Sequence, residues 1–345
     1  MQRLKVNSTD PKFPSPIDRS GWPWFRCENP STANPPTVFF PKISIITPSF
    51  NQGHFIEETI RSVLLQDYPN LEYIIIDGGS TDNTLETIKK YEPWITYWES
   101  IPDRGQAHAI NKGIQKASGD WVAWLNTDDL YLENTLLTIA AILSNSSEPL
   151  SWIVGTTVLT DARLNEISQF KPHLYTAPGR NPKYQPQGWI DFVCTKQSGI
   201  ALPQPSSFWL RNAVIQAGGL NESLQYVMDH ELYGRLAYKG FRPILVDKPL
   251  VYFRTHQNQK TSYFPIAFWK EELDVVYNWV EKANRAEKKT LNQYGNWLNK
   301  QIKAHPYKSF FQKFLSDLKS IVASKNQRLY AFLKRLHTKY YIEKQ

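Results

Sequence analysis

The feature that most constrains the fold is an apolar segment, residues 121–125, that is followed within four residues by two adjacent carboxylates, Asp128 and Asp129. A strand buried in a parallel sheet has an uninterrupted apolar sequence, and ligands of such sheets bind beyond the carboxyl ends of the strands. The two acids are therefore expected at a ligand site, where Mg²⁺ or Mn²⁺ together with phosphate oxygens would offset their repulsion. The alternative is a solvated turn in which an acid caps a helix over 132–143.

Upstream of this segment, strand and helix patterns alternate. Residues 42–48 and 71–77 have the apolar composition of two strands, and residues 55–66 between them carry apolar side chains at helical spacing. A strand–helix–strand unit forces parallel pairing with a right-handed crossover. A further helix is predicted over 103–118, with its apolar residues on one face. The region 42–130 is therefore predicted to be of the α/β class, with parallel strands.

Two polar residues lie at expected strand or helix ends. Asp77 ends a strand and precedes two glycines, so it is either a hydrogen-bond acceptor for a base or ribose or a former of the turn. Arg104 is expected at a helix N-terminus, where the helix dipole already favours anions, and together they would make a phosphate cradle. A surface arginine paired with Asp103 is the alternative.

Composition and charge limit the class of protein. With 345 residues, of which 41% are hydrophobic and 21% charged, the chain can bury a full core. No segment approaches the ~20 apolar residues that span a bilayer, and the first residues lack the apolar core of a signal peptide. We therefore expect a cytoplasmic protein that is soluble or peripheral on the inner face of the membrane.

Seven segments resemble the family-2 glycosyltransferases with the GT-A fold. They are residues 45–51, 76–82, 103–113, 125–129, 218–222, 228–232 and 253–256. The resemblance covers about residues 42–256. It implies a GT-A (Rossmann-like) α/β domain with a mostly parallel central sheet flanked by helices, followed by a helical C-terminal extension.

The resemblance also implies the residues that bind the donor. Thr47 and Asp77 would contact the nucleoside, and Arg104 would lie near its ribose or phosphates. Asn126 and Asp128 occupy the metal motif of the family, usually Asp-any-Asp, so that Asn126 has lost the first charge. Asp128 would contact a Mg²⁺ or Mn²⁺ ion that bridges the diphosphate.

Two further residues complete the implied site. His256 follows the strand-like residues 249–253 and would act near the diphosphate, although it is also explained as a polar residue ending a strand. Asp229 is the candidate general base, because it matches the acid of the family's Glu-Asp-like motif, and Glu231 is its rival. The alternative role of Asp229 is that of a helix N-cap without chemistry.

The domain limits follow from the patterns and the resemblance. Residues 1–41 are predicted to be an extended Pro-rich arm that aromatic side chains could anchor, and residues 42–265 a catalytic domain. Within that domain, 42–130 would bind the nucleotide and 131–265 the acceptor. Aromatic residues of this second half could form an acceptor platform or belong to the core; they are Trp152, Trp189, Phe208, Trp209 and Tyr226.

Residues 266–345 are predicted to be a basic amphipathic helical tail. From 305 to 345 there are nine lysines and arginines against two acids, which accounts for nearly all of the formal net charge of +8. The apolar stripe that these basic residues interrupt can lie on an anionic membrane or pack on the catalytic domain. Nucleic acid is not expected as a partner, because the chain has no recognised binding module.

The function predicted from the resemblance is an inverting glycosyltransferase. It would move a sugar from a nucleoside-diphosphate sugar, preferably of UDP or dTDP, to a saccharide or lipid-linked acceptor in the synthesis of a cell-surface polysaccharide or glycoconjugate. A sugar-1-phosphate nucleotidyltransferase is one alternative, but residues 47–54 lack the basic loop it requires. A non-catalytic nucleotide- or glycan-binding scaffold is the other, and retention of Asp128 and Asp229 disfavours it.

Overall fold

The computed structural model describes residues 13–15, 19–25, 39–173, 190–194, 201–260 and 266–322, without the side chains of residues 191 and 305–322. The strands are β1 Ile43–Ser49, β2 Leu71–Asp77, β3 Tyr97–Ser100, β4 Trp121–Trp124, β5 Leu130–Tyr131, β6 Trp152–Thr160, β7 Glu166–Phe170, β8 Ser207–Leu210 and β9 Pro243–Arg254. The helices are α1 Ile56–Leu64, α2 Thr84–Tyr91, α3 Gln106–Lys116, α4 Thr135–Asn145, α5 Ile190–Val193, α7 Arg211–Ala217, α8 Met228–Tyr238, α9 Ile266–Lys282 and α10 Arg285–Val322, with short 3₁₀ helices η1 Glu92–Trp94 and η2 Gln204–Ser206.

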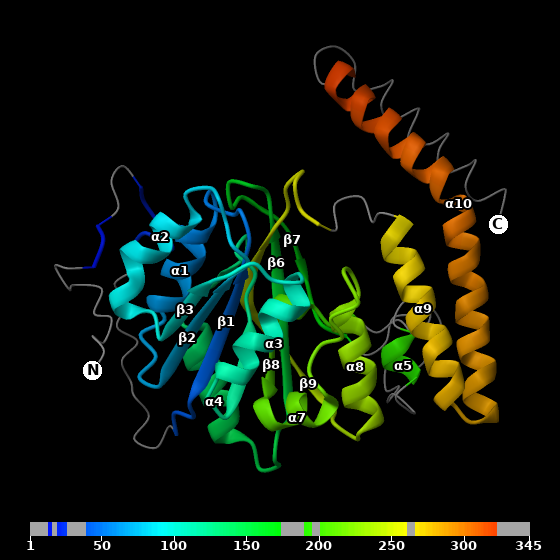
Figure 1. Ribbon diagram of the computed structural model, residues 1–345, viewed down its shortest axis with the longest axis horizontal. Coiled ribbons are helices and arrows are strands. Elements are labelled where there is room, and N and C mark those ends of the chain that lie inside the picture. The colour runs from blue at the N-terminus through cyan, green and yellow to red at the C-terminus, as the bar shows by residue number, and fades with distance from the viewer. Residues whose placement is uncertain are drawn as a thin grey trace.

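The described strands form one twisted sheet with the order β3-β2-β1-β4-β8-β6-β9-β5, and β7 pairs with β6 outside this path (Figure 1). The α/β class is as predicted, but the sheet is mixed. β1 pairs in parallel with β2 and β4, whereas β8 is antiparallel to both β4 and β6. The direction of β8 agrees with a contact between sequence-distant residues: the side chain of Gln204, in η2, donates to the carbonyl of Trp124 at the end of β4, so the chain enters β8 at that edge and runs back.

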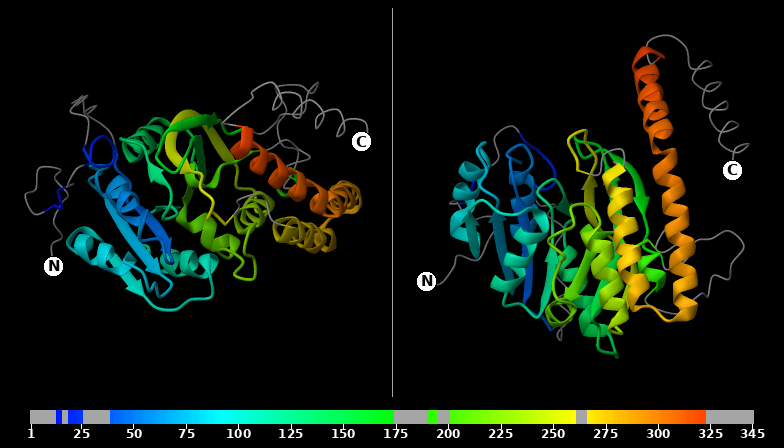
Figure 2. Two further views of the ribbon diagram at one scale, coloured as in Figure 1. Left: turned by 90° about the horizontal axis from the view of Figure 1, so that it is seen from above. Right: turned by 45° about the vertical axis from the view of Figure 1, so that its right-hand side comes forward.

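Helices cover both faces of the sheet and bury two apolar clusters (Figure 2). Side chains of β1 alternate between them, with Ile43 and Ile45 in one cluster and Ile46 in the other. The first cluster joins the sheet to α1, α2 and α4, and the second joins it to α3, α7, α8 and α9. This two-sided burial explains why the central strands are apolar without alternation.

A short strand, rather than a helix, follows the two adjacent acids. Asp128 and Asp129 lie between β4 and β5, and α4 begins only at Thr135, after Asn134 with φ 62°. β5 pairs with β9. The alternative that an acid of this pair caps a helix over 132–143 is therefore wrong, because Asn134, and neither acid, is the N-cap of α4.

The described part of the N-terminal arm is held by one buried arginine. Arg61 of α1 is 2% exposed, and its guanidinium donates to the carbonyls of Pro14, Pro23 and Trp24. It also lies against the aromatic rings of Phe13 and Trp24. Three backbone acceptors and two rings compensate the burial of this charge, and the arm thereby covers the outer side of α1.

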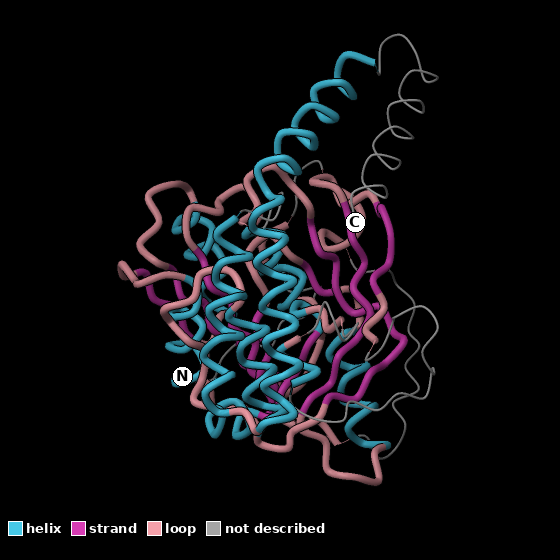
Figure 3. The backbone as a smooth tube through the Cα atoms, turned by 90° about the vertical axis from the view of Figure 1, so that its right-hand side faces the viewer, coloured by secondary structure: helices cyan, strands magenta, loops and turns pink. Residues whose placement is uncertain are grey.

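The two C-terminal helices pack side by side against the second cluster (Figure 3). α9 buries Phe268, Val276 and Trp279, and α10 contributes three residues, Leu291, Tyr294 and Leu298, that are fully buried. The later part of α10 then extends beyond the body of the protein (Figure 1). Within the described ranges, no helix is both long and apolar enough to cross a membrane.

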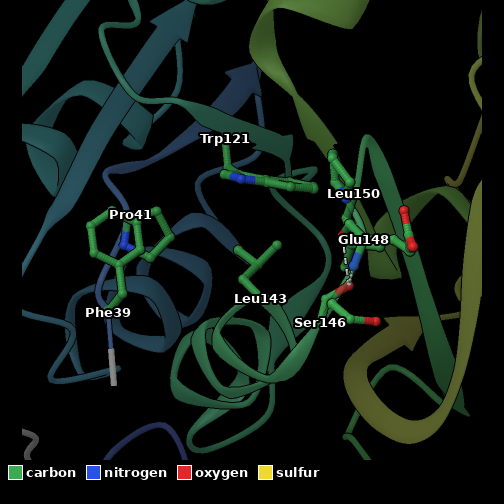
Figure 4. Close-up of a pocket in the computed structure, with 9 residues that line it drawn as sticks. Phe39, Pro41, Trp121, Leu143, Ser146, Glu148 and Leu150 are labelled. Carbon is green, nitrogen blue, oxygen red and sulfur yellow. Dashed lines mark hydrogen bonds between the residues drawn. The ribbon is translucent and has the colours of Figure 1, made fainter. Parts of the chain in front are cut away.

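A cavity of about 350 Å³ opens at the amino ends of the strands (Figure 4). Its lining includes Trp121, the first residue of β4, together with Phe39, Pro41, Leu143 and Leu150. Because Asp128 lies beyond the opposite end of β4, this cavity is separate from the predicted ligand site.

Candidate active site

The predicted polar residues emerge at the carboxyl edge of the parallel strands. In the registers of β1 with β2 and of β2 with β3, Asp77 is opposite Ser49 on one side and Ser100 on the other. β4 lies on the other side of β1, with Trp124 opposite Ile46, so the loop carrying Asn126 and Asp128 leaves the sheet at this edge too. Strands that run in parallel bring sequence-distant polar loops to one edge.

Asp128 and His256 face each other across this edge. The distance from Asp128 Oδ2 to His256 Nε2 is 3.1 Å, and their side chains are 14% and 7% exposed. The pairing of β5 with β9 causes this proximity, because Asp128 precedes β5 and His256 follows β9. The ring of Phe55 packs against the imidazole with centroids 4.7 Å apart and limits its orientations.

Asp129 differs from its neighbour in being fully buried. One of its oxygens accepts the backbone N–H of Arg254 at 3.2 Å and the other accepts from Asn126 Nδ2 at 3.3 Å. Burial raises the pKa of Asp129 well above its ordinary value, and the carboxylate of Asp128 raises it further. The two adjacent acids therefore have different environments. Asp128 faces the edge, and Asp129 is buried and holds the loop through its hydrogen bonds with Arg254 and Asn126.

Asn126 is held by a set of amide side chains. Gln106 Nε2 donates to Asn126 Oδ1 at 2.7 Å, and Asn126 Nδ2 lies 3.4 Å from Gln204 Oε1. Asn126 thus donates to Asp129 and Gln204 while it accepts from Gln106. A carboxylate at this position would accept only, so an asparagine fits these neighbours better than the usual aspartate of the motif.

Asp229 lies in the first turn of α8 with an uncommitted carboxylate. The helix begins at Met228 after the cap position Val227, so Asp229 is not the N-cap. Among the described residues, none makes a hydrogen bond or ion pair with its carboxylate. The start of α8 is fixed from α9, because the carboxylate of Glu271 accepts the backbone N–H groups of residues 225–227.

Glu231, the rival base, is engaged by its own helix. Arg235, one turn later, donates to both of its carboxylate oxygens at 2.6–2.9 Å. Because the guanidinium occupies both carboxylate oxygens, Glu231 has less freedom to accept a hydrogen bond from an acceptor hydroxyl. The geometry therefore favours Asp229 over Glu231.

Arg104 is exposed at the entrance to α3. Its partner is Glu222, with an N–O distance of 2.5 Å, and not Asp103, whose Oδ1 accepts the backbone N–H of Gly105. Gly105 has φ 114°, a conformation that side chains disfavour, and it turns the chain into the helix. The pairing with Asp103 was therefore the wrong alternative, whereas a position near the helix N-terminus was correct.

Thr47 and Asp77 lie at the same edge but are fully buried. Thr47 Oγ1 hydrogen-bonds Tyr73 Oη at 3.1 Å. Asp77 accepts the backbone N–H groups of Gly79 and Ser80 and the hydroxyls of Ser80 and Ser100. These contacts make Asp77 the organiser of the turn that follows β2, so that its contact with a nucleoside remains a prediction.

Three residues of the site were not found from the sequence. Gln106 and Gln204 hold Asn126, and Lys260 Nζ donates to Gln106 Oε1 at 3.2 Å. Lys260 gives no signal in the local sequence, because its contact with Gln106 joins residues that are distant in the chain. Gln106 and Gln204 give no signal either, because a glutamine at the start of a helix is typical of an ordinary surface position.

The aromatic residues of the second half divide between core and surface. Trp152, Phe208 and Trp209 are fully buried, and Trp209 stacks on Trp124 with centroids 4.4 Å apart. These three residues therefore belong to the core. The prediction that they could form an acceptor platform is wrong, because no sugar can reach buried rings. Tyr226 is partly buried and stays a candidate, and Trp189 lies outside the described residues.

The donor set fits a metal that is shared with a ligand. Asp128 offers a carboxylate and His256 an imidazole, both of which bind Mn²⁺, and the carboxylate also suits Mg²⁺. In the described part of the chain, no group of three His, Cys, Asp or Glu residues could enclose an ion. Mg²⁺ usually keeps waters and takes its other ligands from substrate phosphates, so two protein ligands suffice.

Comparison with known proteins identifies the family of this chain. The family model described as Glycosyl transferase family 2 matches residues 44–187. A glycosyltransferase of Mycobacterium tuberculosis is 30% identical over 198 residues, covering 57% of this chain and 69% of the relative. The chain belongs to glycosyl transferase family 2. This family-2 chain is therefore a glycosyltransferase. The putative teichuronic acid biosynthesis glycosyltransferase TuaG of Bacillus subtilis is 40% identical over 105 residues, 29% of this chain and 41% of TuaG.

Solved structures share the fold of this family-2 chain. Staphylococcus aureus TarS in complex with UDP-GlcNAc has a TM-score of 0.53 and 18% identity, covering 73% of this chain and 71% of TarS. The mannosyltransferase PcManGT of Pyrobaculum calidifontis, in complex with GDP-Man and Mn²⁺, has a TM-score of 0.55 and 16% identity, covering 88% and 81%. The GT-A fold predicted from the sequence is thus confirmed.

Proposed function

We propose that this family-2 glycosyltransferase transfers a sugar from a nucleoside-diphosphate sugar to a saccharide or lipid-linked acceptor. The transfer inverts the configuration at the anomeric carbon of the sugar. The observation that carries the proposal is the carboxylate of Asp229, at the start of α8, which makes no hydrogen bond or ion pair with any residue that the structure describes. Inversion requires a base on the acceptor hydroxyl and a leaving group on the opposite side of the sugar carbon. Asp229 would accept the hydroxyl proton while the diphosphate leaves toward Asp128.

The diphosphate would lie at the edge formed by Asp128, Asn126 and His256. Asp128 and His256 would hold Mg²⁺ or Mn²⁺, which stabilises the charge that develops on a departing diphosphate. Arg104 is exposed and would turn from Glu222 toward the ribose or phosphates. The Mn²⁺ complex of PcManGT supports a divalent ion here.

The nucleoside would lie over the loops after β1 and β2. Thr47 and Asp77 shape the floor of this region, and the UDP-GlcNAc complex of TarS supports UDP as the first donor to examine, with dTDP next. The similarity to TuaG supports an acceptor in cell-surface polysaccharide synthesis. Such an acceptor fits a protein on the cytoplasmic side of a membrane.

The proposal is tested with nucleotide sugars and one isosteric variant. In the presence of Mn²⁺, release of nucleoside diphosphate from UDP-, dTDP- and GDP-sugars identifies the donor. NMR of the glycosylated product gives the anomeric configuration of the transferred sugar. Asp229→Asn should lower the turnover by about 10²–10⁴-fold, the usual contribution of a general base, with unchanged donor affinity. Asp274→Asn, an exposed acid on α9, is the matched control.

Three outcomes would contradict the proposal. Full turnover in Asp229→Asn removes the assigned base. Retention of the donor's anomeric configuration removes inversion. Donor binding without turnover in the unmodified protein, with every saccharide and lipid-linked acceptor supplied, would favour the non-catalytic scaffold.

A further inference from the structure

Lys260 is joined to the metal motif through a single amide. Its Nζ donates to Gln106 Oε1 at 3.2 Å, and Gln106 Nε2 donates to Asn126 Oδ1 at 2.7 Å. The ammonium also lies over the ring of Tyr226, 5.8 Å from its centroid. Three separate parts of the chain, at the start of α3, before α8 and after β9, therefore place this lysine at the candidate active site.

Three other cations in the described part of the chain are already paired with acids. Arg104 pairs with Glu222, Arg235 with Glu231 and Arg254 with Glu58; these pairs have N–O distances of 2.5–2.6 Å. A guanidinium that is matched by a carboxylate has little net charge to offer a ligand. An anion that enters the site would first have to break one of these pairs.

Lys260 differs from them because its hydrogen-bond partner is neutral. Within the described ranges it makes no ion pair, and its side chain as a whole is exposed. Neighbouring groups displace water from the ammonium of Lys260, and this desolvation lowers its pKa. The carboxylates of Glu271 and Asp229 raise the pKa in part. Asp229 is thus close enough to interact electrostatically with the ammonium without contacting it.

The acids of the motif also leave this edge less negative than two aspartates would. Asn126 carries no charge, and the carboxyl of Asp129 is fully buried, with its oxygens taken by the backbone N–H of Arg254 and by Asn126 Nδ2. Asp128 remains, facing His256. A donor that brings two phosphate groups therefore meets fewer fixed negative charges and, among the described residues, the ammonium of Lys260 without a paired carboxylate.

We propose that Lys260 binds the diphosphate of the donor directly and stabilises it as it leaves, a role that rests on the proposed transferase function. Lysine acts as a point charge on phosphate and needs no fixed approach. Gln106 holds the ammonium beside Asn126, so the charge stands on the side of the site where the motif lacks an acid. A cation fixed there before the reaction stabilises the leaving group without reorganisation.

The test compares ligands that differ only in their phosphates. Binding of a nucleoside diphosphate, its monophosphate and its nucleoside is measured by calorimetry, with EDTA and with Mn²⁺, for the wild type, Lys260→Ala and Lys260→Arg. UDP, dTDP and GDP are all used. Lys116→Ala is the matched control, because Lys116 is an exposed lysine over a tyrosine ring, Tyr97, at the other end of α3.

We expect Lys260→Ala to weaken diphosphate binding at least about tenfold, equivalent to one lost charge-assisted contact, both with EDTA and with Mn²⁺. Nucleoside binding should change less than about twofold, and Lys260→Arg should recover most of the loss. Lys116→Ala should match the wild type. Turnover with the donor should fall in Lys260→Ala and recover in Lys260→Arg.

The outcomes separate this inference from the function on which it rests. Equal diphosphate affinity in the wild type and Lys260→Ala overturns the role of Lys260 and leaves the transferase proposal intact. A uniform loss for nucleoside and diphosphate also overturns it, because the lysine would then only shape the loop. If the wild type binds none of the three diphosphates, the proposed function itself fails, and the role of Lys260 with it.

Discussion

At the scale of single residues, the amide at position 126 is the clearest departure from an Asp-any-Asp motif. Its Nδ2 donates toward the buried carboxylate of Asp129 and toward Gln204, while its Oδ1 accepts from Gln106. An aspartate would place a second acid against Asp129, whose pKa is already raised by burial. The asparagine thus follows from the surroundings of the side chain, and loss of catalysis does not have to be invoked.

Asn126→Asp should therefore destabilise the protein at neutral pH. The new carboxylate loses a donor and repels Asp129, at a cost of about 1–3 kcal/mol. The carboxyl introduced at position 126 is ionised at pH 7 and binds a proton as the pH falls. It then has a hydrogen-bond donor, so the loss of stability relative to the wild type should shrink toward pH 5. Thermal unfolding at both pH values measures this difference.

Asn221→Asp is the control for this substitution. Asn221 is exposed and its Oδ1 only accepts, from the N–H and the hydroxyl of Ser223, so a carboxylate can replace it. If Asn126→Asp unfolds at the same temperature as the wild type at pH 7, the amide set does not require an asparagine.

At the scale of elements, a buried carboxylate on β2 ties two strands to the end of α3. Glu72 is 5% exposed and accepts from the hydroxyls of Ser44 and Ser118 at 2.6 Å and from the backbone N–H of Ser118 at 2.7 Å. Lys42 Nζ is 2.9 Å away. Burial alone would raise the pKa of Glu72, but these donors outweigh it and lower the pKa to about 2.

This depressed pKa predicts a defined acid sensitivity. Because the folded pKa of about 2 lies below the ordinary 4.5, the stabilisation is present above about pH 4.5 and is lost as the pH falls toward 2. At about 1.4 kcal/mol per pKa unit, it amounts to roughly 3 kcal/mol. Glu72→Gln should lower the free energy of unfolding at pH 7 by up to that amount, and the difference from wild type should narrow below pH 4.5.

Urea unfolding at pH 7 and pH 3 measures the free energy of unfolding of each protein. Glu86→Gln, an exposed acid on α2, is the control and should follow the wild type at both pH values. A difference between Glu72→Gln and the wild type that is the same at pH 3 as at pH 7 would show that ionisation of Glu72 does not stabilise the fold.

At the scale of the whole molecule, the C-terminal helices have two different environments. α9 and the first half of α10 bury apolar side chains in the second core cluster, among them Trp279, Leu291 and Leu298. The later part of α10 extends beyond the body (Figure 1), and the apolar stripe predicted over residues 310–336 lies outside the described side chains. We propose that residues 305–345 bind an anionic membrane, whereas α9 and the first part of α10 pack on the domain.

Removal of residues 305–345 should separate these two roles. The melting temperature should change by only a few degrees, because no buried side chain of α10 named above is lost. Binding to vesicles that contain phosphatidylglycerol should fall at least about tenfold, since each basic residue contributes about 1 kcal/mol near the surface. Sedimentation with vesicles measures the binding, and vesicles of phosphatidylcholine alone are the control.

Equal sedimentation of the truncated and full chains would remove the membrane proposal. A fall of the melting temperature by more than about 10 °C would show that the removed segment packs on the catalytic domain instead.

The sequence determined the class of fold, the parallel half of the sheet and the edge at which the polar residues of the candidate site emerge, because these depend on local periodicity and on the ends of strands. It also determined the candidates Asp128 and Asp229. Tertiary structure alone decided the antiparallel entry of β8, the burial of Trp152 and Trp209, the pairing of Arg104 with Glu222 and the position of Lys260. Each of these depends on contacts between residues that are distant in sequence, for which no local pattern exists.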